Sequence, residues 1–184
     1  MKKDNENMNI NPIFLIFGIL ILSLVGVGVI LAVVFGVRSL SKDYKQANAD
    51  SKITAKKWYA VIILCVVVMI LSWIFNIGWF RLILTWIPLP LIHTIAFLFV
   101  NFKAANKVST FKSLKKYMIL SCASYSLVYL LLPDGGDVGG MYMFFTLIRN
   151  EVITSIMMYI SNIIFCVNIA SLAIEYSELR KCRP

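Results

Sequence analysis

The chain has 184 residues, of which 60% are hydrophobic and only 15% are charged. Ordinary soluble domains are about 45–50% apolar and about 25% charged. This composition excludes a disordered chain, a nucleic-acid-binding arm and a soluble globular enzyme. It predicts an all-α, polytopic membrane protein in which residues 1–184 form a single integral membrane domain.

Five apolar stretches contain no Asp, Glu, Lys or Arg, and each predicts a membrane-spanning helix. Hydrocarbon cannot satisfy exposed backbone polar groups, and about 20 residues of helix cross a bilayer. The fourth stretch is the shortest, so we expect its helix to begin earlier, near Ser113 or Leu114. A bundle of four spans is the alternative if one stretch does not cross. The stretches cover residues 12–37, 58–80, 82–102, 117–132 and 152–174.

The first stretch is longer than the apolar core of about 7–15 residues in a signal peptide, so we expect it to remain as an anchor. Its Gly28, Ala32 and Gly36 form a ridge of small residues at four-residue spacing. Such ridges let helices approach closely in a membrane. The ridge packs either inside the protomer or in an oligomer. We favour an oligomer or a partner, because a long basic connection sets this stretch apart.

Lysine and arginine are distributed unevenly along the chain. Fourteen of the 18 lie in the connections 38–57 and 103–116 or in the tail after residue 174. Cytoplasmic loops are enriched in these residues, so we expect an outside N-terminus and a cytoplasmic C-terminus. Short loops and the absence of an Asn-x-Ser/Thr acceptor favour the plasma (inner) membrane of a prokaryote.

The net charge of +9 is therefore mainly a signal of topology. A basic residue near an anionic membrane surface contributes about 1 kcal/mol of attraction. We expect membrane lipid as the main contact and a cytoplasmic protein as the alternative. No nucleic acid is expected, because aromatic residues do not interleave with the charges. The residues of this surface are Lys42, Lys45, Lys56, Lys57, Lys112, Lys115 and Lys116.

Residues that favour turns or interrupt helices occur in the middle of the chain. Asn76 and Gly78 predict a tight turn after the second stretch, with Arg81 at the outer interface. Pro88 and Pro90 predict a kink or break in the third stretch, because proline removes a backbone donor.

The outer segment 133–151 combines a glycine-rich turn with eight apolar and aromatic residues. The second half is too short to span, so we expect it to lie in the interface or to begin the last helix early. Its two aspartates are interpreted as a solvated turn, since two carboxylates fall short of the six to eight oxygens that calcium takes. This segment is the candidate for outward recognition. Its candidate residues are Asp134, Asp137, Tyr142, Phe144 and Phe145.

Hydrogen-bonding side chains recur near the middle of all five stretches. One interpretation of this mid-membrane polar layer is a polar site or pore constriction. The other, which we favour, is hydrogen bonding between helices, worth about 0.6 kcal/mol per bond. The layer consists of Ser23, Ser72, His93, Ser124, Tyr125 and Asn162.

The last stretch carries two polar faces. Ser161, Asn168 and Glu175 recur every seven residues and share one face, while Ser155, Tyr159 and Asn162 share another. Two such faces predict contacts with two neighbours, or with one neighbour and an aqueous lumen. We expect Asn162→Leu or Asn168→Leu to weaken assembly.

Candidate chemistry is sparse. One histidine and four scattered cysteines predict no zinc site, no metal and no cofactor, and no catalytic residue is assigned. We expect a non-enzymatic multi-pass subunit that forms a homo-oligomer and anchors or senses for a cytoplasmic partner, for example in phage defence or toxin immunity. A small channel or transporter using the polar layer is the alternative. A membrane hydrolase pairing His93 with a serine such as Ser124 is the third.

Overall fold

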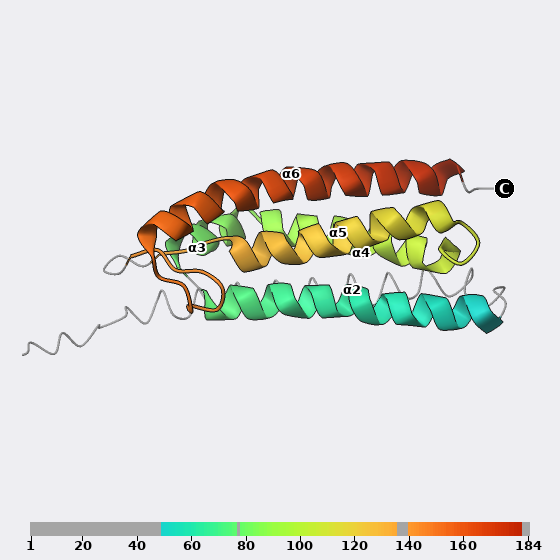
Figure 1. The fold of residues 1–184 in the computed structure, drawn as a ribbon, viewed down its shortest axis with the longest axis horizontal. Helices are drawn as coiled ribbons and strands as arrows, with labels where there is room; N and C mark the ends of the chain where they lie inside the picture. The colour runs from blue at the N-terminus through green and yellow to red at the C-terminus, as the bar shows by residue number, and fades with distance from the viewer. Residues whose placement is uncertain (1–48, 77, 136–139, 182–184) are drawn as a thin grey trace, which may run out of the picture.

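The computed structural model describes residues 49–76, 78–135 and 140–181, which form a helical bundle (Figure 1). Within these residues the regular elements are all helices, accompanied by two isolated antiparallel bridges in the segment before the last helix. Three of the helices, α2, α4 and α6, are long and apolar enough to cross a membrane. The helices are α2 (Ala49–Phe75), α3 (Trp79–Trp86), α4 (Leu89–Lys107), α5 (Lys112–Leu131) and α6 (Glu151–Lys181).

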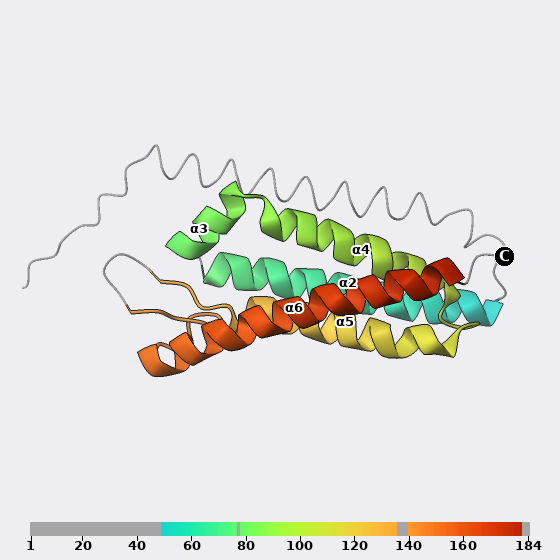
Figure 2. The ribbon, with the colours of Figure 1, turned by 90° about the horizontal axis from the view of Figure 1, so that it is seen from above.

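The four long helices run side by side in alternating directions (Figures 1 and 2). Helices α4 and α5 each pack against both α2 and α6. The start of α2, the α4–α5 connection and the end of α6 lie at one end of the bundle. We call this the basic end, because it carries Lys52, Lys56, Lys57, Lys103, Lys107, Lys115, Lys116, Arg180 and Lys181.

The expected break in the third stretch is confirmed. Helix α3 ends at Trp86 and α4 begins at Leu89, on either side of the first proline. The expected turn is also present, since α2 ends at Phe75 and α3 begins at Trp79. Helix α5 begins at Lys112, close to the expected start. Three lysines occupy its first two turns, which explains why it is absent from the three helices apolar enough to span.

Two helices extend beyond their apolar stretches. Helix α2 begins at Ala49 rather than at residue 58, and α6 continues to Lys181 rather than ending at residue 174. The added turns contain alanine, lysine, glutamate and leucine, which favour helix, and no proline or glycine to end it. The helices therefore carry their charged ends past the apolar region. The predicted span 12–37 lies outside the described residues.

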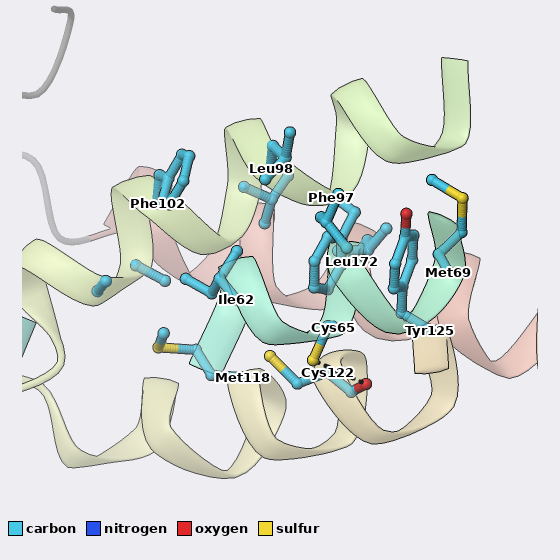
Figure 3. Close-up of a cluster of buried hydrophobic side chains, with 14 of the residues drawn as sticks. Ile62, Cys65, Met69, Phe97, Leu98, Phe102, Met118, Cys122, Tyr125 and Leu172 are labelled. Carbon is cyan, nitrogen blue, oxygen red and sulfur yellow. Dashed lines mark hydrogen bonds between the residues drawn. The ribbon is translucent and has the colours of Figure 1, made fainter. Parts of the chain in front are cut away.

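Apolar side chains from α2, α4, α5 and α6 interlock in the centre of the bundle (Figure 3). The ring of Phe97 stacks on that of Tyr125 with their centroids 3.9 Å apart. Close by, the Cys65 thiol donates to the backbone carbonyl of Cys122 at 3.6 Å. Many large apolar side chains on the outward faces stay exposed, as expected for helices that contact lipid. Of α2, α4 and α6, helix α6 is the least buried, with 17% of its apolar region inside the bundle.

Candidate functional site: polar clusters inside the bundle

A buried arginine closes the end of the bundle opposite the basic end. The side chain of Arg81, in α3, is fully buried. Its Nη1 donates to the carbonyl of Ser72 at 2.6 Å, and its Nη2 donates to those of Tyr129 and Leu132 at 3.1 and 2.7 Å. These carbonyls lie at the C-terminal ends of α2 and α5, where the helix dipole favours a cation. Arg81 therefore joins the ends of two helices.

The carboxylate of Asp134 lies against the same arginine. It is 3.7 Å from Nε of Arg81 and is fully buried as well. Its Oδ2 accepts hydrogen bonds from the backbone N–H groups of Gly78 and Arg81, at 3.1 and 2.9 Å. Asp134 thus caps the N-terminus of α3 from the α5–α6 connection. A side chain on Gly78 would meet this carboxylate at 2.4 Å, so the contact requires glycine there.

Charge is retained on the arginine in spite of its burial. Helix α3 is not among the helices long enough to span, and Arg81 lies between two apolar stretches. Burial lowers the pKa of Arg81 to about 10, and the Asp134 carboxylate opposes this shift. The guanidinium is therefore protonated at neutral pH and pairs with the aspartate.

A second cluster centres on His93 in α4. Its Nδ1 lies 2.9 Å from the Tyr129 hydroxyl in α5, and its Nε2 lies 2.7 Å from the Asn168 Oδ1 in α6. The amide nitrogen of Asn168 donates to the Ser121 carbonyl and to Ser124 Oγ, both at 2.8 Å. One histidine and one asparagine thus connect three helices inside the apolar core.

The cluster continues toward the basic end through α5. Ser121 Oγ lies 2.9 Å from Asn101 Oδ1 in α4 and 3.1 Å from Glu175 Oε2 in α6. All three side chains are essentially buried. Tyr129 contacts His93 through its hydroxyl and Arg81 through its backbone carbonyl. Residues in polar contact with one another therefore extend from Glu175 to the opposite end, although different atoms of Tyr129 and Ser121 make the successive contacts. We call these residues the buried polar chain: Arg81, Tyr129, His93, Asn168, Ser121 and Glu175.

The predicted mid-membrane layer divides into two parts. Ser72, His93, Ser124 and Tyr125 are buried, and their polar atoms form hydrogen bonds to other residues in the bundle. Asn162 is exposed on α6 instead. Ser23 lies outside the described residues, as do Gly28, Ala32 and Gly36. The contacts of the buried members correspond to hydrogen bonding between helices, the interpretation that the sequence favoured.

The two polar faces of α6 have different environments. Ser161, Asn168 and Glu175 all face the bundle, and Ser161 Oγ donates to the Val128 carbonyl at 3.2 Å. The other face is exposed, and Tyr159 there is 73% exposed. The Asn168 amide forms its hydrogen bonds within the chain, so we now expect Asn168→Leu to act on folding rather than on assembly.

The outer segment differs from expectation at Asp134, and one of two alternatives for its apolar half is excluded. Asp134 is not part of a solvated turn, since burial and the ion pair with Arg81 remove it from water. Of the two alternatives for the apolar half, an early start of the last helix is excluded, since α6 starts at Glu151, and a position in the membrane interface stays a prediction. Tyr142 is half-buried and its backbone pairs with that of Asp134. Asp137 lies outside the described residues.

Two aromatic residues and a threonine form a strained turn in this segment. Phe144, Phe145 and Thr146 have positive φ angles of 51°, 58° and 64°, which are costly for residues other than glycine. The turn is held from α2: Asn76 Oδ1 accepts the backbone N–H of Thr146 at 2.7 Å. The Phe75 ring also contacts that of Phe145 edge-on, at 5.9 Å.

The predicted basic residues that the structure describes lie at one end of the bundle. Lys56, Lys57, Lys115 and Lys116 are exposed at the basic end. Lys112 opens α5 at the same end. Lys42 and Lys45 lie outside the described residues.

The two residues named for a possible membrane hydrolase do not contact each other. His93 contacts Tyr129 and Asn168, while Ser124 Oγ donates to the Leu120 carbonyl at 2.6 Å. The serine–histidine pair of the third alternative is therefore not formed between these two residues. In the part of the chain that is described, no three His, Cys, Asp or Glu side chains cluster to hold a metal. A cavity of about 140 Å³ opens between α3, α4, α5 and α6, and it is lined by Leu84, Leu89, Pro90, Val128, Tyr129, Leu132, Ser161, Asn162 and Phe165.

Two important residues were missed as site residues by sequence reasoning. Arg81 was assigned only to the interface, although a lone charge between two apolar stretches is a signal that it pairs with another charge. Glu175 was noted only for its seven-residue spacing. That spacing places it on the buried face of α6, where a carboxyl group requires a specific partner.

Comparisons with family models, with curated proteins and with solved structures gave no match to the chain.

Proposed function

We propose that the protein is a non-enzymatic multi-pass membrane subunit that self-associates and anchors or senses for a cytoplasmic partner. The observation that carries this proposal is the segregation of charge along the bundle. Exposed lysines from α2 and α5 gather at the basic end, while the other end is closed by Arg81 and Asp134.

The same segregation supports an orientation. Under the positive-inside rule the basic end faces the cytoplasm, so the strained turn at Phe144–Thr146 faces outward. Residues 12–37 and α5 complete five spans in this proposal. The membrane is the plasma (inner) membrane of a prokaryote, and phage-defence and toxin-immunity systems are examples of processes that use such a subunit.

Self-association is assigned to the exposed polar face of α6. This face, the α6 seam, consists of Ser155, Tyr159, Asn162, Cys166 and Ala173, all exposed and spaced by four, three, four and seven residues. The adjacent exposed face contains Val152, Ile156, Ile163, Val167 and Ile174. Lipid suits the second face, but it cannot satisfy the Asn162 amide, which has no hydrogen-bond partner in the described part of the chain.

A second copy of the chain fits the α6 seam. Two copies inserted in the same direction are related by an axis along the membrane normal, so each seam residue meets its own counterpart at the same depth. A carboxamide both donates and accepts, so two Asn162 side chains pair with each other. The four–three spacing is that of parallel paired helices, in which a single Asn selects register.

The proposal that the basic end binds a cytoplasmic partner is tested by purification in a gentle detergent. The mass of the complex is then determined and the proteins that co-elute are identified. Charge reversal at Lys56 with Lys57, or at Lys115 with Lys116, should remove a bound partner. Arg149→Glu is the matched control, because Arg149 is exposed at the opposite end. If nothing co-elutes, or if both charge reversals leave the bound protein in place, the basic end is not a docking surface.

A small channel or transporter is the second candidate function. It is favoured by the buried polar chain, which places His93 and Glu175 in the interior of the bundle. Proton or cation flux into liposomes, reduced by His93→Gln, supports this candidate. Flux equal to that of empty liposomes would rule out the channel or transporter function.

A further inference from the structure

Glu175 is a carboxyl group deep in an apolar bundle. It lies about two helical turns before the end of α6, and its residue is 0% exposed. Its Oε2 lies 3.1 Å from Ser121 Oγ, while its Oε1 has no hydrogen-bond partner. A charged carboxylate in this position lacks most of the hydrogen bonds that water would supply.

No cation compensates this carboxyl within the described residues. The two ion pairs there join Arg81 to Asp134 and Lys181 to Glu178. Helix α4 contributes the uncharged Asn101, which is linked to Glu175 through Ser121. The nearby titratable group on α5 is the Cys122 thiol, which lies 3.7 Å from the same Asn101 oxygen. An ionised Glu175 would therefore be a buried charge without a counter-ion.

The number of donors and acceptors around Ser121 indicates an additional proton on a neighbouring group. The hydroxyl has a single hydrogen, yet its oxygen lies within 3.2 Å of three acceptors: Asn101 Oδ1 at 2.9 Å, Glu175 Oε2 at 3.1 Å and the Met118 carbonyl at 3.2 Å. If Ser121 donates to Asn101, an ionised Glu175 has no donor. If it donates to Glu175, Asn101 Oδ1 keeps only the weak thiol of Cys122 at 3.7 Å.

A proton on the glutamate resolves this conflict. The Glu175 O–H then donates to Ser121 Oγ, and the Ser121 hydrogen is free to reach Asn101 Oδ1. We propose that Glu175 is a proton-binding site, protonated at neutral pH in the assembled bundle. Losing the proton turns the Ser121 hydrogen toward Glu175 and breaks the α4–α5 hydrogen bond. Proton binding is thereby linked to packing near the basic end, whether or not the anchoring function holds.

Infrared spectroscopy of the purified full-length protein tests the proposal. A protonated carboxyl has a carbonyl stretch that is distinct from the bands of a carboxylate. We expect this band at neutral pH, expect Glu175→Gln to remove it, and expect it to disappear as the pH is raised. Glu178→Gln should retain it, because Glu178 is paired with Lys181 at the surface.

Isotopic labelling keeps the test decisive if Glu175→Gln does not fold. Labelling glutamate with carbon-13 in the unsubstituted chain shifts the band only if it belongs to a glutamate, and so separates Glu175 from the buried Asp134. Ser121→Ala provides a further check, since it should move the band by removing the acceptor of the O–H. A neutral-pH spectrum without a protonated glutamate band overturns the proposal.

Discussion

The guanidinium of Arg81 and the carboxylate of Asp134 form a fully buried ion pair at 3.7 Å, although 53 positions separate them in the chain. The pair lies where α2, α3 and α5 meet. Arg81 binds carbonyls at the ends of α2 and α5, and Asp134 binds N–H groups at the start of α3. One ion pair therefore satisfies backbone groups at three helix ends.

Arg81→Leu should destabilise the fold strongly. The change leaves Asp134 charged, buried and without its cation, a situation that costs about 3–5 kcal/mol. Unfolding of the detergent-solubilised protein by denaturant measures the loss. Arg149→Leu is the control and should change stability by less than about 0.5 kcal/mol, because that side chain is exposed. Equal stability of the two variants would show that the buried pair contributes little.

Asn168→Leu and Asn162→Leu should affect different properties. The first leaves the bonds of His93 and Ser124 unmade, and each unsatisfied buried group costs about 1–3 kcal/mol. Thermal unfolding of the monomer should therefore shift down for Asn168→Leu and remain near the original value for Asn162→Leu. The mass in detergent should fall only for Asn162→Leu. A lower oligomer mass for a well-folded Asn168→Leu would contradict the intramolecular role of Asn168.

The strained outer turn should tolerate, or gain from, glycine. Thr146 has φ 64° and a β-branched side chain, and the left-handed region costs a non-glycine residue about 1–2 kcal/mol. Thr146→Gly should therefore leave stability equal or raise it by up to about 1 kcal/mol. Asn76→Ala should lower stability, because it removes the acceptor for the Thr146 N–H. A marked loss of stability in Thr146→Gly would indicate that the threonine side chain, rather than the backbone, holds the turn.

Helical architecture was predictable because it depends on local composition. Apolar runs locate α2, α4 and α6, prolines locate the break after Trp86, and the seven-residue spacing of Ser161, Asn168 and Glu175 identifies the buried face of α6. These signals act within a helix or a turn, so a single sequence contains them.

Contacts between distant segments were not predictable in the same way. Asp134 in a glycine-rich segment has the pattern of a solvated turn, and only its proximity to Arg81 changes that interpretation. The partners of His93 likewise come from α5 and α6, at positions that depend on how the helices pack. The exposure of Asn162 also follows from packing, since its sequence neighbours resemble those of the buried Asn168.

The α6 seam supplies its own probe for self-association. Cys166 is exposed on the seam beside Asn162, whereas Cys65 and Cys122 are buried. In a chain with every other cysteine replaced by serine, mild oxidation in the membrane should join two copies through Cys166, because equivalent seam residues meet across the two-fold axis. The yield should fall severalfold in Asn162→Leu if the amide pair sets the register.

The matched control moves the thiol to the lipid-facing side of the same helix. Ile163→Cys in the cysteine-free chain places it at similar depth on the apolar face, where Ile163 is 64% exposed. It should give no cross-linked dimer beyond that of random collision, which dilution with excess lipid reduces. Cross-linking that is stronger at residue 163 than at residue 166 would move the interface to the apolar face. Absence of cross-linking at both positions would show that α6 faces lipid or another protein.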